Sequence, residues 1–160
     1  MINQQNITFI KYEDDKLIEA AKIILSEKLY ENEEFCLYNL SNEIIEENIT
    51  SDYEIIFAVN DKKEFYGVLI IDKIYYKSFD WYVGTNHLTK DMQTTINKKM
   101  KVMIYIKNKY RHNKIGTLLT ETLDKNNVFA YKGINGSEKF WKNNGIKCFG
   151  FDEYGFTKRL

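Results

Sequence analysis

The alternation of hydrophobic and polar residues divides the first half of the chain into a strand, two helices and a hairpin. Residues 6–12 (NITFIKY) alternate between apolar and polar side chains, as expected for a strand with one buried face. Residues 13–29 begin with acidic side chains and continue with a helical stripe of apolar ones, and residues 37–47 show a second such stripe. Residues 53–72 hold two apolar runs around the polar turn NDKK, which predicts an antiparallel hairpin.

The second half of the chain predicts short strands and helices in alternation. Residues 101–107 (KVMIYIK) are rich in β-branched and large apolar side chains, which is typical of a central strand buried on both faces. Residues 116–125 predict a helix with Leu118, Leu119, Thr122 and Leu123 on its buried side. A strand, a helix ended by NNG and one or two closing strands follow, at residues 128–133, 137–143 and 146–160. Residues 73–100 fit no element clearly.

Length and charge restrict the class of protein. The chain has 160 residues, which suits one domain, and we find no repeat or linker, so residues 1–160 are expected to form a single α/β domain. Lys and Arg number 23, as do Asp and Glu, and this balance argues against a dedicated nucleic-acid binder. There is neither a leader pattern nor an apolar run near 18 residues, which predicts a cytoplasmic protein without a membrane segment. Cys36 and Cys148 lie far apart without metal spacing and are expected to be buried thiols.

The segment KNKYRHNKIGTLLTETL (107–123) is the strongest candidate for chemistry. It places Arg111, Lys114 and Gly116 in a polar turn between an apolar strand and an amphipathic helix. The first amides of a helix have no internal partners and the helix dipole is positive there, so such a turn can hold a phosphate. Neither a Walker ending nor the three glycines of the dinucleotide fingerprint is present. From these residues alone, a phosphate site and an ordinary turn with solvated basic side chains both remain open.

Two longer stretches are similar to motifs of the GNAT acetyltransferase superfamily. IYIKNKYRHNKIGTLL (104–119) resembles the acetyl-coenzyme A loop, whose pattern is Arg or Gln, two residues, Gly, one residue, and Gly or Ala. Lys114 replaces the first glycine of that pattern, which predicts that this position does not adopt a positive φ. SEKFWKNNGI (137–146) resembles the segment AxxFYxKxGF, with Ser137 for Ala and Trp141 for Tyr.

The resemblance covers nearly the whole chain and implies both a fold and an activity. The fold class is α/β (α+β), with a GNAT-type central sheet that is mixed, mostly antiparallel and twisted, and helices on both faces. The activity is transfer of the acetyl group of acetyl-coenzyme A, the co-substrate, to a primary amine by direct attack. An alternative from a different class is a coenzyme A-binding interaction or regulatory protein with the same fold and little or no transferase activity.

The resemblance also implies which residues hold the coenzyme. The pantetheine arm would pair with the strand at Met103, Ile104, Tyr105 and Ile106, and the pyrophosphate would lie on the loop. The remaining coenzyme-binding residues implied are Arg111, His112, Asn113, Lys114, Ile115, Gly116, Thr117, Ser137, Phe140 and Trp141. Thr117 could equally be a helix cap.

Catalytic residues are less well determined. The strand KVMIYIK carries no carboxylate, although the family often places a glutamate there as the general base. Candidates for that role, by residue type and rough location, are Tyr105, His87, Asp80 and Glu54. Trp141 occupies the place of the family's proton-donating tyrosine, and an indole N–H donates hydrogen bonds but no useful proton. Either another hydroxyl (Tyr131, Ser137 or Tyr154) replaces it, or the thiolate leaves unassisted, or the protein binds coenzyme A without efficient transfer.

The acceptor is not determined by these residues. A small-molecule amine and a protein amine fit equally, and the neutral net charge counts against aminoacyl-tRNA. The aromatic segment YYKSFDWYVGTNH (75–87) either builds the acceptor site or packs against the core. No metal site is expected, and family precedent allows a homodimer.

Overall fold

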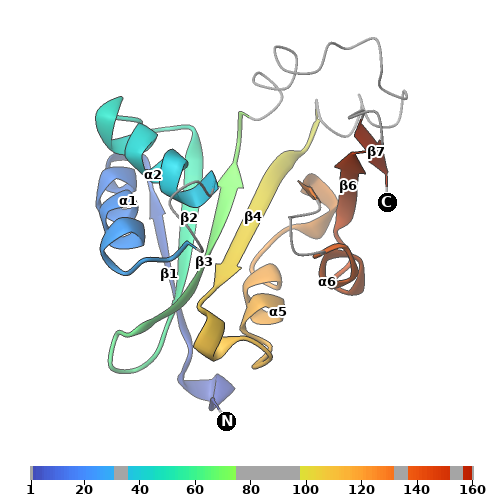
Figure 1. The fold of residues 1–160 in the computed structure, drawn as a ribbon, viewed down its shortest axis with the longest axis horizontal. Helices are drawn as coiled ribbons and strands as arrows, with labels where there is room; N and C mark the ends of the chain where they lie inside the picture. The colour runs from blue at the N-terminus through green and yellow to red at the C-terminus, as the bar shows by residue number, and fades with distance from the viewer. Residues whose placement is uncertain (1, 31–35, 75–97, 132–136, 152–156, 160) are drawn as a thin grey trace. The chain divides into compact units, whose positions relative to one another are not determined.

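The computed structural model describes residues 2–30, 36–74, 98–131, 137–151 and 157–159, which include seven strands (Figure 1). Neighbouring strands hydrogen-bond in chain order, from β1 to β7. The chain divides into two compact units: Met1–Ile70 with Ile104–Leu119 form unit 1, and Ile71–Met103 with Thr120–Leu160 form unit 2. Strands β3 and β4 therefore have residues in both units.

Unit 1 contains the predicted first strand and hairpin. Strand β1 (Thr8–Glu13) pairs antiparallel with β2 (Tyr53–Val59), and β3 (Phe65–Asp72) follows after the turn at residues 60–64. The carboxamide oxygen of Asn60 accepts hydrogen bonds from the amides of Lys62 and Glu64, which closes the turn. Almost every side chain of β2 and β3 is buried. The strand and the hairpin are confirmed, but the buried face predicted for the first strand is wrong, since the residues of β1 are exposed or half-exposed.

The two predicted helices of unit 1 are α1 (Leu17–Ser26) and α2 (Cys36–Glu46). Helix α1 packs against α2 and against β1 and β2, as Figure 1 shows. Its apolar stripe is fully buried at Leu17, Ala20, Ala21 and Ile24. Such a stripe stabilises the helix mainly through burial, at roughly 1.5–3 kcal/mol for each large aliphatic side chain. Short 3-10 helices, η1 (Gln4–Asn6) and η2 (Asp14–Lys16), flank β1.

Strand β4 (Met100–Ile106) is less buried than its sequence predicts. Only Val102 and Tyr105 are buried, and the other five residues are half-exposed, so the prediction of a strand buried on both faces is wrong. Lys101 is one physical reason, because a charged side chain is costly to bury. Its Nζ lies 5.5 Å from the centre of the Tyr131 ring in unit 2.

Helix α5 (Ile115–Thr120) is shorter than predicted and buries a different set of residues. Ile115, Leu119 and Thr120 are buried, whereas Leu118 and Leu123 are half-exposed and Thr122 is exposed. The helix ends early because the Leu123 amide turns back to the Thr120 carbonyl. The following residues form η5 (Lys125–Asn127), where the Asp124 side chain accepts from the Asn126 amide. Local side-chain bonds of this kind compete with a helix.

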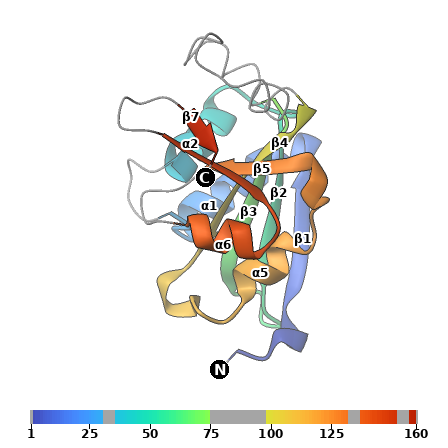
Figure 2. The same ribbon diagram turned by 90° about the vertical axis from the view of Figure 1, so that its right-hand side faces the viewer.

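Unit 2 contains the closing strands and the last helix. Strands β5 (Val128–Tyr131) and β6 (Lys147–Phe151) are parallel, and β7 (Thr157–Arg159) is antiparallel to β6. The start of β4 pairs parallel with β5, so the sheet is mixed, as predicted. Helix α6 (Glu138–Asn143) packs against β6, and Figure 2 shows both from the side.

The backbone geometry at the end of helix α6 explains why residue 145 is a glycine. The Ile146 amide bonds to the Trp141 carbonyl and the Gly145 amide bonds to the Lys142 carbonyl, which is the pattern of a Schellman motif. Gly145 has a φ of 73°, a conformation that strains any residue with a Cβ. Ile146 and Trp141 are both buried, as the hydrophobic contact of that motif requires.

Replacing Gly145 with Ala is expected to destabilise the protein by roughly 1–2 kcal/mol through backbone strain. A Cβ at this position would meet only the Lys125 side chain, at 3.9 Å, so no steric term is added. Thermal unfolding would then shift down by about 2–8 °C. Asn143→Ala, at an exposed position inside the helix, is the control and should leave the melting temperature nearly unchanged. Equal melting of Gly145→Ala and wild type would contradict the left-handed conformation.

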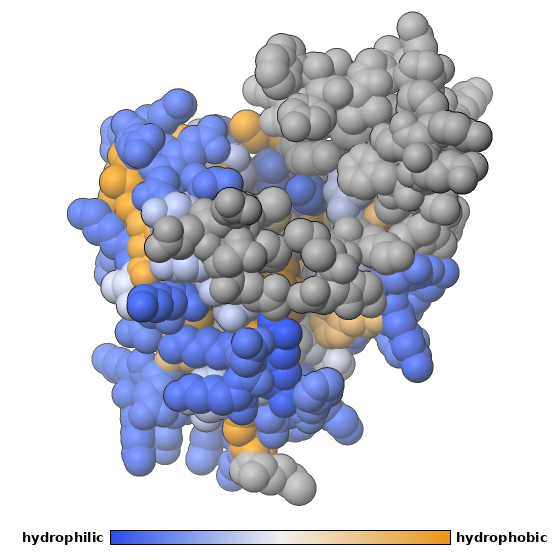
Figure 3. Space-filling model, viewed as in Figure 1, coloured by the Kyte–Doolittle hydropathy of each residue, from blue (hydrophilic) through white to orange (hydrophobic). Residues whose placement is uncertain are grey.

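The described surface offers few hydrophobic areas on the face drawn in Figure 3. Polar and charged side chains cover most of it, and hydrophobic ones form small separate areas. Phe9 on β1 is a large apolar side chain with substantial exposure, at 37%. Within the described ranges, no helix is long and apolar enough to cross a membrane. Where the described residues form that face, its hydrophobic areas are small, and the candidate site rests on polar geometry.

Candidate functional site

The segment that follows β4 is anchored to β3 within unit 1. The Lys107 amide donates to the Tyr66 carbonyl at 2.9 Å, directly after the last residue of β4. The next residues form the 3-10 helix η4 (Asn108–Tyr110), and the Tyr110 ring packs edge-on against the Tyr66 ring with centroids 4.5 Å apart. Aromatic pairs of this geometry contribute roughly 0.5–1.5 kcal/mol beyond area burial. The loop therefore begins from a fixed point.

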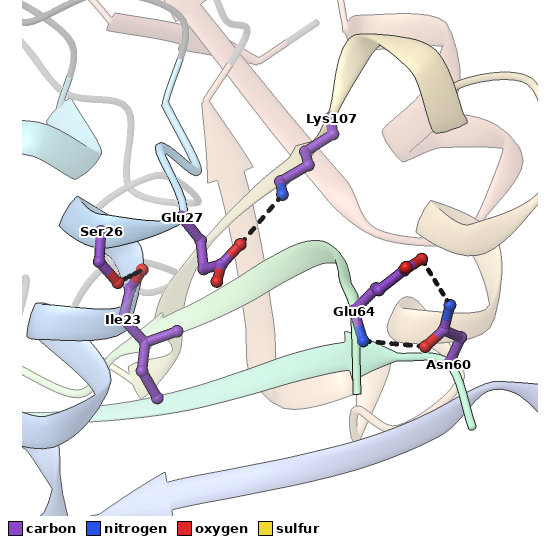
Figure 4. Close-up of polar contacts among 6 residues, drawn as sticks. All are labelled: Ile23, Ser26, Glu27, Asn60, Glu64 and Lys107. Atoms are coloured by element: carbon purple, nitrogen blue, oxygen red, sulfur yellow. Dashed lines mark hydrogen bonds and ion pairs between the residues drawn. The ribbon is translucent and has the colours of Figure 1, made fainter. Parts of the chain in front are cut away.

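A second anchor joins the start of the loop to helix α1. The Lys107 ammonium lies 3.4 Å from a carboxylate oxygen of Glu27, just beyond the end of α1 (Figure 4). The Lys107 side chain is only 21% exposed and that of Glu27 is 42% exposed. An ion pair this accessible adds little stability, about 0–1 kcal/mol. Its consequence is geometric, because it fixes where the first cation of the loop lies.

Arg111 folds back onto β4. Its Nε donates to the Ile106 carbonyl at 3.1 Å, and its guanidinium carbon lies 5.6 Å from the centre of the Tyr105 ring. A guanidinium at this distance from an aromatic ring is in the range of a cation–π contact. Part of the donor capacity of Arg111 is thus used within the chain, whereas the resemblance predicted a contact with the coenzyme.

Asn113 is held by the loop and by the N-terminal segment. Its Nδ2 donates to the carbonyls of Tyr110 at 3.1 Å and Arg111 at 3.0 Å. Its Oδ1 accepts a longer bond, of 3.4 Å, from the Ile2 amide. These bonds turn the side chain towards the protein, so a contribution of Asn113 to a ligand would come from its backbone.

The loop contains two residues in the left-handed region. His112 has a φ of 65° and Lys114 a φ of 62°. The prediction that position 114 does not need a positive φ is therefore wrong: Lys114 adopts the conformation for which the family uses glycine. Residues other than glycine are uncommon in the left-handed region, and those that adopt it cluster at functional sites. Both side chains are exposed.

Replacing Lys114 with Gly is expected to stabilise the protein by up to about 1 kcal/mol. Relief of the left-handed strain contributes roughly 1–2 kcal/mol, and the extra freedom of glycine in the unfolded chain removes about 0.5–1 kcal/mol. Urea unfolding measures the difference. Lys109→Gly is the matched control, since Lys109 lies in η4 and is not left-handed; it should lose stability. Equal losses in both variants would rule out the left-handed turn.

Helix α5 begins directly after this turn. Its first intrahelical bond runs from the Leu118 amide to the Lys114 carbonyl at 3.0 Å. Ile115 is buried and anchors the helix, while Gly116 and Thr117 are half-exposed. Gly116 and Thr117 therefore lie in the first turn of the helix, directly after Lys114 and Ile115, and their contact with a coenzyme stays a prediction.

The second motif forms part of the core of unit 2. Trp141 is buried, and its ring packs edge-on against the half-exposed Phe140 with centroids 5.0 Å apart. The Asn144 side chain donates to the Phe140 carbonyl and accepts from the Thr120 hydroxyl at 3.2 Å, which ties α6 to the end of α5. Ser137 lies at the start of α6, where its side chain makes no capping bond.

The structure describes only some of the remaining catalytic candidates. Glu54 on β2 pairs with Lys11 of β1 at 3.5 Å and lies opposite Glu13 in the register. Asp80, His87, Tyr154 and the aromatic segment 75–87 lie outside the described residues. Tyr105 is a candidate that the structure does describe next to the loop, because the Arg111 guanidinium lies over its ring.

The role of some residues that shape the candidate site was not predicted from the sequence. Tyr66 and Glu27 anchor the loop through contacts between distant segments, which no local pattern shows. Gly67 beside Tyr66 could have been found, because a glycine inside a strand pattern often marks a close approach of another backbone.

Comparison with known proteins identifies the fold. No protein-family model matches the chain, and no curated protein matches its sequence. Among solved structures, a protein of Exiguobacterium sp. 255-15 assigned as an acetyltransferase is 14% identical, with a TM-score of 0.53 over 96% of this chain and 91% of that one. A mutant of the Vibrio cholerae spermidine N-acetyltransferase SpeG is 13% identical, with a TM-score of 0.52 over 98% and 92%. The Acinetobacter baumannii aminoglycoside 6'-N-acetyltransferase AAC(6')-Ih is 12% identical, with a TM-score of 0.51 over 88% and 90%.

These likenesses extend over nearly the full length of both chains in each pair, whereas sequence identity is low. They bear on architecture and confirm the fold that the two sequence motifs predicted. This chain has the α+β fold of the GNAT acetyltransferases.

Proposed function

We propose that this protein is an N-acetyltransferase that transfers the acetyl group of acetyl-coenzyme A to a primary amine. The observation that carries the proposal is the loop from Arg111 to Gly116. It follows β4, turns through two left-handed residues and bears three basic side chains. The shared fold supports the same conclusion, because the loop occupies the chain position at which the family binds its coenzyme.

The loop suits a pyrophosphate for a physical reason. Left-handed residues placed between residues of negative φ turn successive backbone N–H groups towards one side, which forms a concave anion site. Arg111 is extended, with a φ of −63°, and the left-handed His112 and Lys114 follow. We propose that the amides of residues 112–117 hold the pyrophosphate and that the Lys114 ammonium adds charge. The β4 backbone from Met103 to Ile106 would pair with the pantetheine arm.

The proposed chemistry is direct attack on the thioester. The acceptor amine must first lose a proton, because the pKa of an alkyl amine lies well above neutral pH. We propose that a backbone amide of β4 polarises the thioester carbonyl and that the strand fixes the thioester next to the amine. With no carboxylate on β4, the proton leaves through water or through the Tyr105 hydroxyl. The chain's own contribution is chiefly to orient the two reactants.

The acceptor class follows less directly. Two of the similar structures are named for acetylation of spermidine, a small polyamine, and of an aminoglycoside, which carries amino sugars. We propose a small-molecule or protein amine as acceptor. A net charge of zero disfavours aminoacyl-tRNA, because polyphosphate partners select basic surfaces.

A binding protein without turnover is the second candidate, favoured by the missing carboxylate on β4 and by the burial of Trp141. Release of the coenzyme A thiol, followed with a thiol reagent across polyamines, aminoglycosides, lysine peptides and charged tRNA, separates the two. Acetyl transfer to at least one amine is expected. Coenzyme A binding by calorimetry without turnover on any of these would favour the binding protein, and no coenzyme binding would refute both.

A further inference from the structure

Strand β3 approaches β4 closely at Gly67. A Cβ built on Gly67 would lie 2.5 Å from the Tyr105 carbonyl oxygen, 2.5 Å from Ile106 Cδ1 and 3.1 Å from Ile106 Cα. Contacts below 3.0 Å are essentially absent for real Cβ atoms, and two of these three atoms belong to the backbone, which cannot turn aside. Only glycine therefore allows the end of β4 to lie where it does.

Arg111, which lies in the loop, contacts the same two residues, Tyr105 and Ile106. Its Nε bonds to the Ile106 carbonyl, and its guanidinium stacks over the Tyr105 ring. Tyr105 is buried and Ile106 is half-exposed. Gly67 lies against the peptide between Tyr105 and Ile106, and Arg111 binds the carbonyl of the next peptide, so both fix the end of β4.

We propose that Gly67 and Arg111 are positioning residues for acyl transfer, which together set where the end of β4 meets the pantetheine arm. This inference rests on the proposed function. It gives Arg111 a different role from the one the resemblance implies, since Arg111 acts through β4 instead of serving mainly as a phosphate ligand. Lys114 and the loop amides then carry the phosphate contacts.

The physical consequence is that substitution of Gly67 should change the affinity for the two halves of the coenzyme by different amounts. Gly67→Ala would move the backbone of Tyr105 and Ile106 by roughly an ångström, and displacement on that scale can reduce a rate by about a hundredfold. The three atoms nearest to the new methyl group belong to Tyr105 and Ile106, not to the loop from residue 112 to residue 117. The pantetheine end of the coenzyme should therefore lose affinity while the nucleotide end keeps it.

Calorimetry with coenzyme A and with adenosine 3'-phosphate 5'-diphosphate, which keeps the pyrophosphate but lacks the pantetheine arm, tests this. Gly67→Ala is expected to weaken coenzyme A binding at least tenfold and to leave binding of this nucleotide within threefold of wild type. Arg111→Lys keeps the charge but loses the Nε bond and the guanidinium over the Tyr105 ring, so it should weaken coenzyme A at least fivefold and the nucleotide by less than threefold. Equal losses for both ligands in Arg111→Lys would identify it as a phosphate ligand and overturn the inference.

Two control variants distinguish an effect of the position of the β4 backbone from effects of lost stability or lost charge. Val68→Ala removes buried volume from the same strand without adding an atom towards β4. Lys109→Gln removes an exposed loop charge that lies over the Tyr110 ring. Both should bind the two ligands as wild type does. If Gly67→Ala does not fold, Arg111→Lys decides the question. Wild-type protein that binds neither ligand would refute the proposed function, whereas unchanged ligand ratios in both test variants would refute only this inference.

Discussion

Simultaneous replacement of Arg111 with Glu and of Gly116 with Asp is expected to weaken coenzyme A binding by at least tenfold. The double variant places two negative charges beside the proposed pyrophosphate site and removes one cation. A pair of like charges near a protein surface costs on the order of 1–4 kcal/mol, whereas a tenfold loss of affinity requires about 1.4 kcal/mol. The Asp side chain would also occupy the space beside the backbone that a phosphate would approach at Gly116.

The loss should occur without unfolding. Arg111 and Gly116 are only partly buried, so circular dichroism should be unchanged and the melting temperature should fall by a few degrees at most. Lys22→Glu with Ser26→Asp changes the net charge by the same amount on the exposed face of α1, and it serves as the control. Calorimetry at two salt concentrations would show a smaller difference at high salt. Coenzyme affinity equal to wild type would remove the loop from the site.

The order of strands and helices could be predicted because each has a simple pattern. The stripe of α1, the alternation of β1 and the polar turn of the β2–β3 hairpin are local features, and the structure has all of them. The C-terminal cap of α6 was also visible in the letters NNG, since a left-handed glycine satisfies the last carbonyls of a helix. Local propensity and burial agree in these elements, so the sequence determined them.

The errors arose where several local tendencies compete. For α5, apolar spacing continues to Leu123, but the Asp124 side chain binds the backbone of the next turn and the helix stops at Thr120. At Lys114 the side-chain type argued for an ordinary φ, while the loop's own bonds impose a left-handed one. In both places the deciding bonds are formed by side chains with the nearby backbone, which hydrophobic periodicity does not record.

The site itself could be predicted only in part. Its loop was predicted because the motif is contiguous in sequence, and its role in binding stays a prediction. The residues that hold the loop in place come from β3 and α1, far from it along the chain, and their contacts with Lys107 become visible only in the folded protein. Gly67 is the exception, and its position inside a strand of large apolar residues was an unused signal.

Trp141 lies where the sequence resemblance places the family's tyrosine, and its surroundings predict a large effect of substitution on stability and a small one on the proposed transfer. The indole is buried and packs on Phe140. Trp141 lies in the last turn of α6, where its backbone carbonyl accepts the capping bond from the Ile146 amide. Trp141→Ala is therefore expected to cost about 3–5 kcal/mol, which lowers the melting temperature by roughly 6–20 °C. Lys139→Ala, at an exposed position of the same helix, should change it by less than about 2 °C.

Trp141→Phe tests whether the indole takes part in the proposed transfer. Phenylalanine keeps an aromatic ring against Phe140 but has no N–H to donate, so the turnover number at saturating acetyl-coenzyme A should stay within threefold of wild type. The reason is chemical: an indole gives up no proton in this pH range, and a thiolate is a good enough leaving group to depart without one. A tenfold fall in turnover with unchanged coenzyme affinity would show instead that the N–H stabilises the departing sulfur. The family's tyrosine and this tryptophan would then perform related work by different means.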